Sequence, residues 1–181
     1  RRLGVSEEQP YAISDRSEGL AAMMLEAIDN RHQPLTLERL LQWHHWLFPA
    51  DDWTLQRVRV GQLRAEEPMQ VVSGRLDQPT VHFEAPPRQG LEQALACFID
   101  WFNASLNDPG QDPLLRAAIC HLWFVTLHPF DDGNGRITRA LTDLALSQAD
   151  SQSIRLYAMS VAILEQRADY YRVLEQTQKG G

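Results

Sequence analysis

The sequence has only two cysteines among its 181 residues, Cys97 and Cys120. Two thiols cannot build the dense disulfide framework that holds many small secreted domains together. Both lie in apolar segments, where a free cysteine behaves as a small hydrophobic residue. We therefore expect two buried, reduced cysteines in a cytoplasmic protein.

Long hydrophobic runs are also missing. No apolar stretch reaches the roughly 20 residues that a membrane-spanning helix requires. The start of the chain, Arg1-Arg2-Leu3, soon turns polar and does not resemble a signal peptide. We expect no contact with a membrane. Because the chain opens on arginine instead of methionine, we also expect that it is a fragment.

Basic residues are outnumbered by acidic ones. The 17 Lys and Arg residues against 24 Asp and Glu residues give a formal net charge of −7. Binding along nucleic-acid phosphates needs a basic face, so we expect this domain to bind no nucleic acid. That balance still permits a local basic pocket for a nucleotide. With 44% hydrophobic and 23% charged residues, the chain suits one globular domain over residues 1–181.

Hydrophobic residues recur at helical spacing through most of the chain, which predicts an all-α fold, a compact helical bundle. The helix that begins at Pro113 is apolar on every side from Ala117 onward, which is typical of a central, buried helix. The predicted helices cover residues 17–30, 36–48, 89–102, 113–127, a segment around 137–145 after a glycine-rich turn, and 161–176.

One region breaks the helical pattern. Between Val58 and Phe83 apolar residues tend to alternate with polar ones, and Gly61, Gly74 and Pro79 interrupt the segment. Alternation bounded by turn residues is typical of β-strands. We predict a β-hairpin over 58–83, embedded in the helical bundle.

The segment that carries chemistry lies between two predicted helices and reads His-Pro-Phe-Asp-Asp-Gly-Asn-Gly-Arg at 128–136. Gly133 and Gly135 permit backbone conformations with positive φ, in which successive N–H groups point into one concavity. The helix that starts there adds unpaired N–H groups and the positive end of its dipole. The segment therefore predicts an anion site, and phosphate is the usual anion.

Side chains around this turn extend the site. Arg136 and Arg139 are three residues apart, so both can face the phosphates from one side of the helix. Asp132 beside a polyphosphate is a natural Mg²⁺ ligand, whereas we expect Asp131 to be a turn residue. His128 precedes the turn and can take a proton from a hydroxyl. This set is what phosphoryl-type transfer requires, with its helix-loop-helix spanning 112–149.

Other motifs with similar composition are excluded by spacing. No phosphate-binding loop of the Gly-x-x-x-x-Gly-Lys-Ser/Thr type is present. The pair Gly133 and Gly135 lacks the third glycine of a dinucleotide-binding turn and follows a helix instead of a strand. A calcium loop that began at Asp131 would need glutamate where Thr142 stands.

The segment from His128 to Arg139 resembles the signature of the Fic family, whose members transfer AMP from ATP to hydroxyl groups of proteins. The family pattern is His-Pro-Phe-x-Asp/Glu-Gly-Asn-Gly-Arg-x-x-Arg, and every fixed position is met. The resemblance implies a Fic-type fold and a nucleotidyltransferase, a protein adenylyltransferase, that uses ATP and Mg²⁺. It also implies an unidentified protein target, self-modification and a homodimer as in many relatives, and flanking domains missing beyond Arg1 and Gly181.

The resemblance assigns roles to individual positions. His128 would be the general base, Phe130 would hold the loop in the core, and Asp132 would bind Mg²⁺. Gly133, Asn134 and Gly135 would form the anion hole, and Arg136 and Arg139 would hold the outer phosphates. The hairpin would be a flap that binds an extended target segment by strand addition, through Val71, Val72, Ser73 and Gly74.

A second motif concerns regulation. The segment from Ser14 to Gly19, Ser-Asp-Arg-Ser-Glu-Gly, resembles the inhibitory motif Ser/Thr-x-x-x-Glu-Gly/Asn of Fic proteins with an inhibitory helix on the N-terminal side. The resemblance implies that residues 1–30 include this helix. Glu18 would reach Arg139 and compete with the γ-phosphate for its guanidinium.

Several alternatives remain open. The enzyme could remove AMP or transfer another phosphate-containing group, or the domain could bind a nucleotide without catalysis. Arg155 and Tyr157 follow the motif helix and are candidates for the adenine pocket, with ordinary packing as the alternative. We interpret His44 and His45, which lie between two tryptophans, as part of a helix packed in the core.

Overall fold

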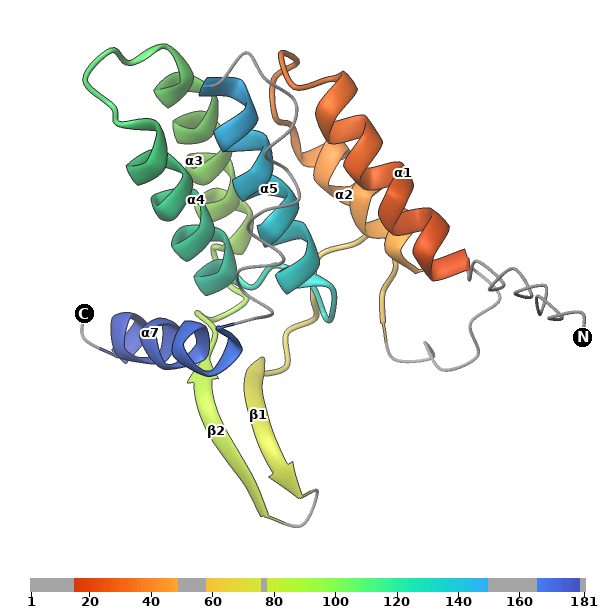
Figure 1. Ribbon diagram of the computed structural model, residues 1–181. Coiled ribbons are helices and arrows are strands. Elements are labelled where there is room, and N and C mark those ends of the chain that lie inside the picture. The colour runs from red at the N-terminus through yellow and green to blue at the C-terminus, as the bar shows by residue number, and fades with distance from the viewer. Residues whose placement is uncertain (1–14, 49–57, 76–77, 150–165, 180–181) are drawn as a thin grey trace, which may run out of the picture.

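The computed structural model describes residues 15–48, 58–75, 78–149 and 166–179 (Figure 1). Its elements are α1 (Asp15–Asp29), α2 (Leu37–Leu47), β1 (Gln70–Arg75), β2 (Gln78–Glu84), α3 (Leu91–Ala104), a 3₁₀ turn (Ser105–Asn107), α4 (Pro113–Leu127), α5 (Asn134–Ala149) and α7 (Arg167–Lys179). The predicted helical bundle with one hairpin is confirmed.

Capping residues explain where two of the helices begin. Thr36 precedes α2 and accepts a hydrogen bond from the Arg39 N–H at 3.2 Å. Asp112 does the same for α4 through the Leu115 N–H at 2.9 Å, with Pro113 in the first helical position. A side-chain acceptor satisfies one of the free N–H groups of the first turn. The predicted starts of these two helices therefore agree with the structure to within one residue.

The bundle centres on α4 and α5, which pack against each other, with α3 beside α4 and the pair α1–α2 beside α5 (Figure 1). Aromatic residues from three helices and the loop before α5 fill the core, namely Trp43, Phe98, Phe102, Phe124 and Phe130. Two burial predictions are wrong. Cys97 is exposed because α3 buries the opposite stripe that includes Phe98, and Ala118 of α4 also faces solvent.

The hairpin is shorter than predicted. Strands β1 and β2 pair antiparallel from Gln70 with Glu84 to Arg75 with Gln78, and an irregularity lies between Val71 and Val72. Residues 58–69 contain turns and irregular backbone before β1. Val58 and Val60 pack against the helical core instead of forming strand, so their spacing reflected burial and not a β-ladder. The hairpin extends away from the bundle (Figure 1).

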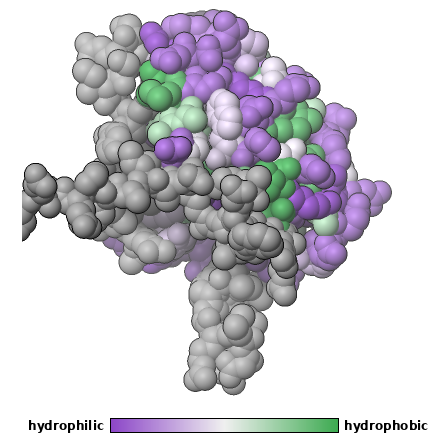
Figure 2. Space-filling model, turned by 90° about the vertical axis from the view of Figure 1, so that its right-hand side faces the viewer, coloured by the Kyte–Doolittle hydropathy of each residue, from purple (hydrophilic) through white to green (hydrophobic). Residues whose placement is uncertain are grey.

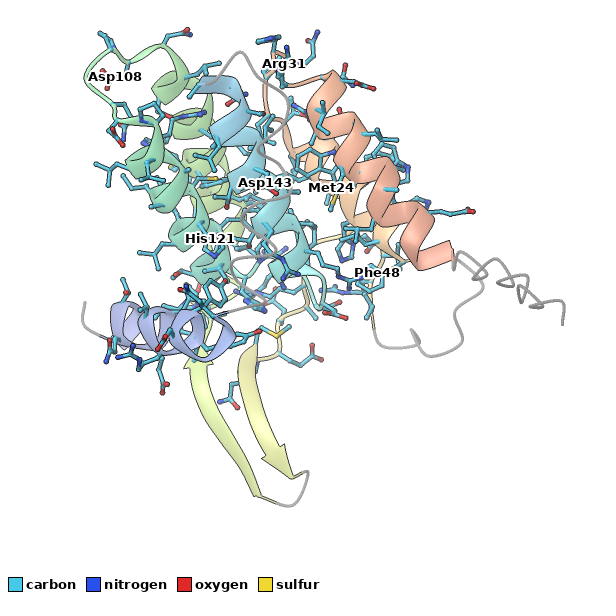
Figure 3. The ribbon with its side chains drawn as sticks, in the orientation of Figure 1. Met24, Arg31, Phe48, Asp108, His121 and Asp143 are labelled. Atoms are coloured by element: carbon cyan, nitrogen blue, oxygen red, sulfur yellow. The ribbon has the colours of Figure 1, made fainter. Side chains whose placement is uncertain are left out.

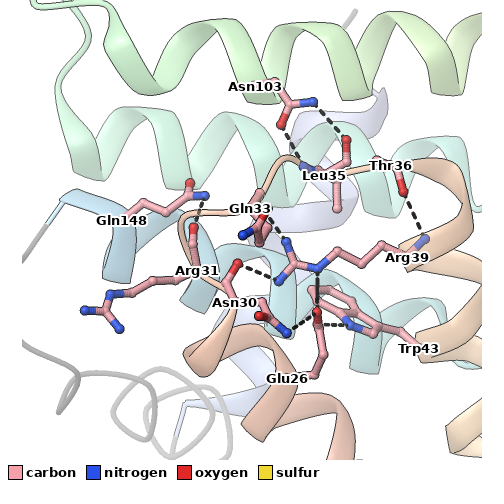
Figure 4. A network of polar contacts seen from close by, with 10 residues as sticks. All are labelled: Glu26, Asn30, Arg31, Gln33, Leu35, Thr36, Arg39, Trp43, Asn103 and Gln148. Atoms are coloured by element: carbon pink, nitrogen blue, oxygen red, sulfur yellow. Dashed lines mark hydrogen bonds and ion pairs between the residues drawn. The ribbon is translucent and has the colours of Figure 1, made fainter.

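A polar network fixes α1 against α2 at the far end of α1 (Figure 4). The Glu26 carboxylate accepts hydrogen bonds from the Trp43 indole N–H at 2.6 Å and from the Arg39 guanidinium at 3.1 Å. The same guanidinium donates to the carbonyl oxygens of Asn30 and Gln33 in the turn after α1. The last turns of α1 are thereby tied to α2 by charge-assisted hydrogen bonds.

The face of the molecule that carries α1 is mostly hydrophilic, with apolar residues interspersed (Figure 2). Leu20 and Leu25 are exposed side chains of α1. None of the helices in the described ranges combines the length and the apolar character needed to cross a membrane.

Candidate active site

His128 ends α4 in an unusual backbone conformation. Its φ of 47° and ψ of 57° are left-handed, and it is the only non-glycine residue with positive φ in the described ranges. Its N–H still donates to the Phe124 carbonyl at 3.1 Å, as the last hydrogen bond of the helix. The left-handed residue turns the chain sharply out of α4, so the motif loop starts at the helix end.

The hydrogen bonds of the His128 ring define its tautomer. Nδ1 lies 3.2 Å from the Val125 carbonyl oxygen, which can only accept, so Nδ1 carries the hydrogen. Nε2 then keeps its lone pair and can take a proton. Burial lowers the pKa of His128 below its ordinary value, and the positive charge of Arg64 lowers it further. The neutral, proton-accepting form is therefore favoured near pH 7.

Asn134 closes the motif loop from inside. Its side-chain oxygen accepts from the Phe130 N–H at 3.0 Å, and its amide nitrogen donates to the Phe130 carbonyl at 2.8 Å. Both residues are buried, and the Phe130 ring stacks on His44 with centroids 4.2 Å apart. The side chain of Asn134 is thus committed to the loop, and only its backbone N–H is available to an anion.

The backbone of the turn differs from the prediction at one of its two glycines. Gly133 has a φ of 81°, whereas Gly135 lies in helical conformation within the first turn of α5. A Cβ on Gly135 would meet no atom within 4 Å, so the space beside it is open. The N–H groups of Asn134 and Gly135 have no acceptor among the residues that the structure describes. These two donors at the start of α5 can bind a phosphate.

Asp132 and Arg136 lie on the solvent side of this turn. Their side chains are 3.7 Å apart, and 62% of the Asp132 side chain is exposed. The Arg136 guanidinium lies over the Phe48 ring, 4.9 Å from its centroid, and a Cβ added at Gly133 would come within 3.1 Å of the same ring. An accessible carboxylate next to a phosphate site suits Mg²⁺, which takes few protein ligands. Within the described ranges no three His, Cys, Asp or Glu side chains form a ready-made metal site.

Arg139 lies one turn further along α5, partly buried. Its positive charge acts on His121, Asp143 and Tyr170, which surround it from α4, α5 and α7. The His121 Nε2 lies 2.7 Å from the Tyr170 hydroxyl, and in Figure 3 His121 points from α4 toward α7. A basic group therefore lies beside the anion site, with α7 packed close to it.

Two residues with contacts to the loop could not be identified from the sequence. His44, interpreted above as a core residue, is buried, but its Nε2 lies 3.2 Å from the Asp132 carbonyl oxygen. Its Nδ1 accepts from the Gly61 N–H at 2.9 Å. Arg64 is also buried and binds the loop backbone near His128. Their partners lie 17 to 88 residues away, so no local pattern marks them.

The proposed turn residue Asp131 has a further partner. Its carboxylate accepts from the Arg59 backbone N–H at 3.0 Å and lies 3.4 Å from the Arg59 guanidinium. It therefore faces the segment before the hairpin, which leaves Asp132 as the carboxylate available to a metal ion.

The inhibitory motif lies partly within the described residues. Glu18 is exposed on the first turn of α1, and the described ion pairs include none between Glu18 and Arg139. Gly19 lies so close to α2 that a Cβ would come within 1.7 Å of the Trp46 carbonyl oxygen. Ser14, Arg155 and Tyr157 lie outside the described residues.

The flap residues occupy the expected strand. Val71, Val72, Ser73 and Gly74 all belong to β1 and pair with β2. The described sheet has two strands, and α7 contacts β2. The edge of β1 away from β2 is therefore the candidate for an added strand.

Comparisons with known proteins identify the family of the chain. Residues 34–146 match the Fic/DOC family. The chain is 29% identical over 153 residues to protein adenylyltransferase fic-1 of Caenorhabditis briggsae, which covers 84% of this chain and 26% of that protein. The corresponding protein of Caenorhabditis elegans is 30% identical over 156 residues, with the same coverage. The chain thus spans about a quarter of the length of these relatives.

Solved structures show the same fold. A Fic-domain-containing signaling protein from Bacteroides thetaiotaomicron has a TM-score of 0.66 at 24% identity, covering 90% of this chain and 55% of that one. A Fic family protein from Desulfovibrio desulfuricans has a TM-score of 0.63 at 25% identity, covering 96% and 47%. The family match includes the whole motif from His128 to Arg139, and the chain belongs to the Fic/DOC family.

Proposed function

We propose that this domain is a nucleotidyltransferase that moves AMP from ATP to a hydroxyl group of a protein, its own chain included. The observation that carries the proposal is the arrangement around His128. Its Nε2 is free to accept a proton, and six and seven residues further along the chain the N–H groups of Asn134 and Gly135 open an anion site. The relatives named as protein adenylyltransferases support the same chemistry.

The proposed reaction is a single displacement. His128 Nε2 takes the proton of a Ser, Thr or Tyr hydroxyl, and the oxygen attacks the α-phosphorus of ATP. A bond forms between that oxygen and phosphorus, and the bond to the leaving pyrophosphate breaks. The N–H groups of the turn, with Arg136 and Arg139, hold the phosphates. Asp132 would hold Mg²⁺, which neutralises phosphate charge when bound.

The central test is the loss of the base. Replacing His128 by Ala should lower transfer of label from α-labelled ATP by roughly 10² to 10⁴-fold, the range for general-base catalysis. The matched control is His32→Ala, because His32 is exposed in the turn after α1. Undiminished labelling in the His128→Ala protein would exclude this mechanism. Mass spectrometry of the product distinguishes added AMP from another phosphate-containing group.

We further propose that β1 binds the target as an added strand. Neighbouring residues of a strand direct their N–H groups to opposite edges, so only one of Val72 and Ser73 faces the open edge. Proline at the position facing that edge removes one donor without breaking the pairing to β2. We expect that variant to label fewer proteins in a cell lysate while its hydrolysis of ATP to AMP continues. Equal losses of both activities would refute the docking role.

We propose, third, that α1 inhibits the site through Glu18. Gly19 packs on Trp46, and two residues later Phe48 lies beside Gly133 and Arg136, so the start of α1 lies near the anion site. Glu18 is exposed here, so inhibition would require its carboxylate to swing toward Arg139 when a nucleotide approaches. Competition for a guanidinium is sufficient to displace a γ-phosphate.

Two substitutions test this inhibition separately. Glu18→Gln removes only the charge and should raise self-modification several-fold, with Glu38→Gln in α2 as the control. Gly19→Ala would introduce a methyl group where Trp46 leaves no room, so α1 must move away from α2. We expect Gly19→Ala to raise activity as well. Unchanged or lower labelling in both variants contradicts the inhibitory role.

A further inference from the structure

The segment from Arg59 to Arg64 crosses the motif loop before the chain enters the hairpin. It contacts the loop at its two ends, because Arg59 binds the Asp131 carboxylate and Arg64 binds the backbone at His128 and Pro129. Between them the Gly61 N–H donates to His44, which in turn bonds the Asp132 carbonyl. The loop is thus held from outside α4 and α5, the helices that it joins.

Arg64 makes the most direct of these contacts. Its Nε donates to the His128 carbonyl at 2.9 Å, and its backbone N–H donates to the Pro129 carbonyl at 2.9 Å. A terminal nitrogen of the guanidinium donates to the Pro86 carbonyl, two residues after β2. The side chain is only 2% exposed. A buried guanidinium that satisfies backbone carbonyls has a fixed position and fixes theirs.

We propose that Arg64 is a positioning residue for the transfer reaction: it holds the His128 backbone in its left-handed conformation and so directs the imidazole toward the incoming hydroxyl. The proposal rests on the proposed function of His128. It names a residue from outside the motif, 64 positions earlier in the chain, as part of the machinery of the base.

The physical reason lies in the strain at His128. A left-handed backbone costs a non-glycine residue about 1–2 kcal/mol, so the peptide relaxes unless its neighbours oppose that change. The two hydrogen bonds from Arg64 to consecutive carbonyls oppose it directly. Relaxation would rotate Cβ of His128 and break the Nδ1–H bond to Val125 that sets the tautomer. A displacement of about 1 Å in a reacting group can reduce the rate by roughly 10²-fold.

Arg64 has a second effect, on proton affinity. Its positive charge lowers the pKa of His128, while the Val125 carbonyl and the Asp132 carboxylate raise it. Removing the charge should therefore raise the pKa of His128 and protonate the base at a higher pH. This effect separates Arg64 from residues that only stabilise the fold.

The experiment compares Arg64→Gln and Arg64→Lys in AMP transfer from α-labelled ATP, with Arg172→Gln as the control because Arg172 pairs with Asp169 on the surface of α7. We expect both Arg64 variants to lose about 10²-fold in kcat, with KM for ATP changed less than about threefold. The acid limb of the pH profile should move to higher pH in Arg64→Gln and stay in Arg64→Lys, which keeps the charge.

A third variant keeps the test decisive if the buried substitutions impair folding, which thermal melting would show. Arg88 donates to the Arg64 carbonyl at 2.8 Å from a more exposed position, so Arg88→Gln should loosen Arg64 and lower kcat by about three- to tenfold. Full kcat in Arg64→Lys, a changed KM alone, or an unmoved acid limb in Arg64→Gln would overturn the proposal. If instead the wild-type protein and His128→Ala transfer AMP equally, the proposed function itself fails.

Discussion

Two buried arginines lie at opposite ends of the α4–α5 pair, and their comparison separates a side chain that ties helix ends together from one that holds the motif loop. Arg64 is 2% exposed at the motif end and Arg116 is 3% exposed at the other end. Within the described ranges neither forms an ion pair with a carboxylate, and each donates to two backbone carbonyls. The two guanidiniums are therefore alike in burial and in the kind of hydrogen bond that they make.

Their partners differ. Arg116 donates to the Phe102 carbonyl at 2.7 Å and to the Ala145 carbonyl at 3.3 Å, near the ends of α3 and α5, and to Ser105 and Gln148. The Phe102 carbonyl lies in the last turn of α3, where carbonyls lack partners within the helix, so Arg116 completes that helix end and ties it to α5. Arg64 binds carbonyls on either side of the reactive loop. The role of a buried guanidinium therefore depends on the backbone segment that it binds. Arg116 binds helix ends and stabilises the fold, whereas Arg64 binds the motif loop and, as proposed, positions His128.

The largest expected effect is loss of Arg116. Arg116→Met removes the hydrogen bonds of a buried guanidinium to Phe102, Ser105, Ala145 and Gln148, and each is worth about 0.5–1.5 kcal/mol net. We expect the free energy of unfolding to fall by about 3 kcal/mol and the melting temperature to fall by roughly 6–12 °C. Denaturant unfolding measures the first and calorimetry the second. Below its melting temperature the variant should transfer AMP at the wild-type kcat. If Arg116→Met instead lost as much kcat as Arg64→Gln, the proposed difference between the two arginines would be wrong.

The next effect concerns His44, which binds the loop at the same end as Arg64. His44→Phe keeps an aromatic ring against Phe130 but removes the hydrogen bonds to Gly61 and Asp132. We expect kcat to fall about tenfold and the unfolding free energy to fall by about 1–2 kcal/mol. Burial lowers the pKa of His44 to about 4, so the wild-type ring stays neutral from pH 5 to 8. His45→Phe, at the exposed neighbour, is the control and should change neither quantity.

The last expected effect concerns stability alone and lies midway between the two ends. Asp143 is 1% exposed, and neither carboxylate oxygen has a hydrogen-bond partner in the described part of the chain. Burial raises its pKa to about 7, so the folded protein binds a proton that the unfolded chain releases near pH 4. Stability from this group is therefore full below about pH 4 and is lost as pH rises to about 7.

Asp143→Asn removes that titration. The variant should gain on the order of 2 kcal/mol relative to wild type between pH 5 and pH 8, measured by denaturant unfolding at both values. Exposed Asp100 provides the control in Asp100→Asn. If the free energy of unfolding depended on pH equally in Asp143→Asn and wild type, the prediction that Asp143 binds a proton on folding would be wrong. The substitution can also change the unfolding free energy by the same amount at both pH values, and that change cancels when the values at pH 5 and pH 8 are subtracted.

The sequence predicted which residues lie together at the start of α5, because they are close along the chain. The glycines, Asp132, Arg136 and Arg139 lie within a few residues, so spacing along the chain becomes proximity on a helix start. Helix positions followed from apolar periodicity for the same reason. The structure differs in finer detail, because Gly135 is helical and the Asn134 side chain turns inward to bond Phe130.

Contacts between distant segments could not be predicted. Nothing near Arg64 in the sequence distinguishes it from a surface arginine, since its partners are 22 and 64 residues away. Val58 and Val60 have strand-like spacing, yet they lie before the hairpin and pack against the helical core. The exposure of Glu18 likewise depends on how α1 packs on α2 and not on its motif.

The left-handed backbone of His128 predicts which substitution at this position would stabilise the protein. Glycine adopts a left-handed backbone readily, so at this one position it would suit the turn better than any side-chain-bearing residue. Random mutagenesis screened for thermal stability alone should therefore recover glycine at 128, and the recovered proteins should be inactive. The residue that best ends α4 and the residue that best serves the proposed reaction are different, and the chain carries the second.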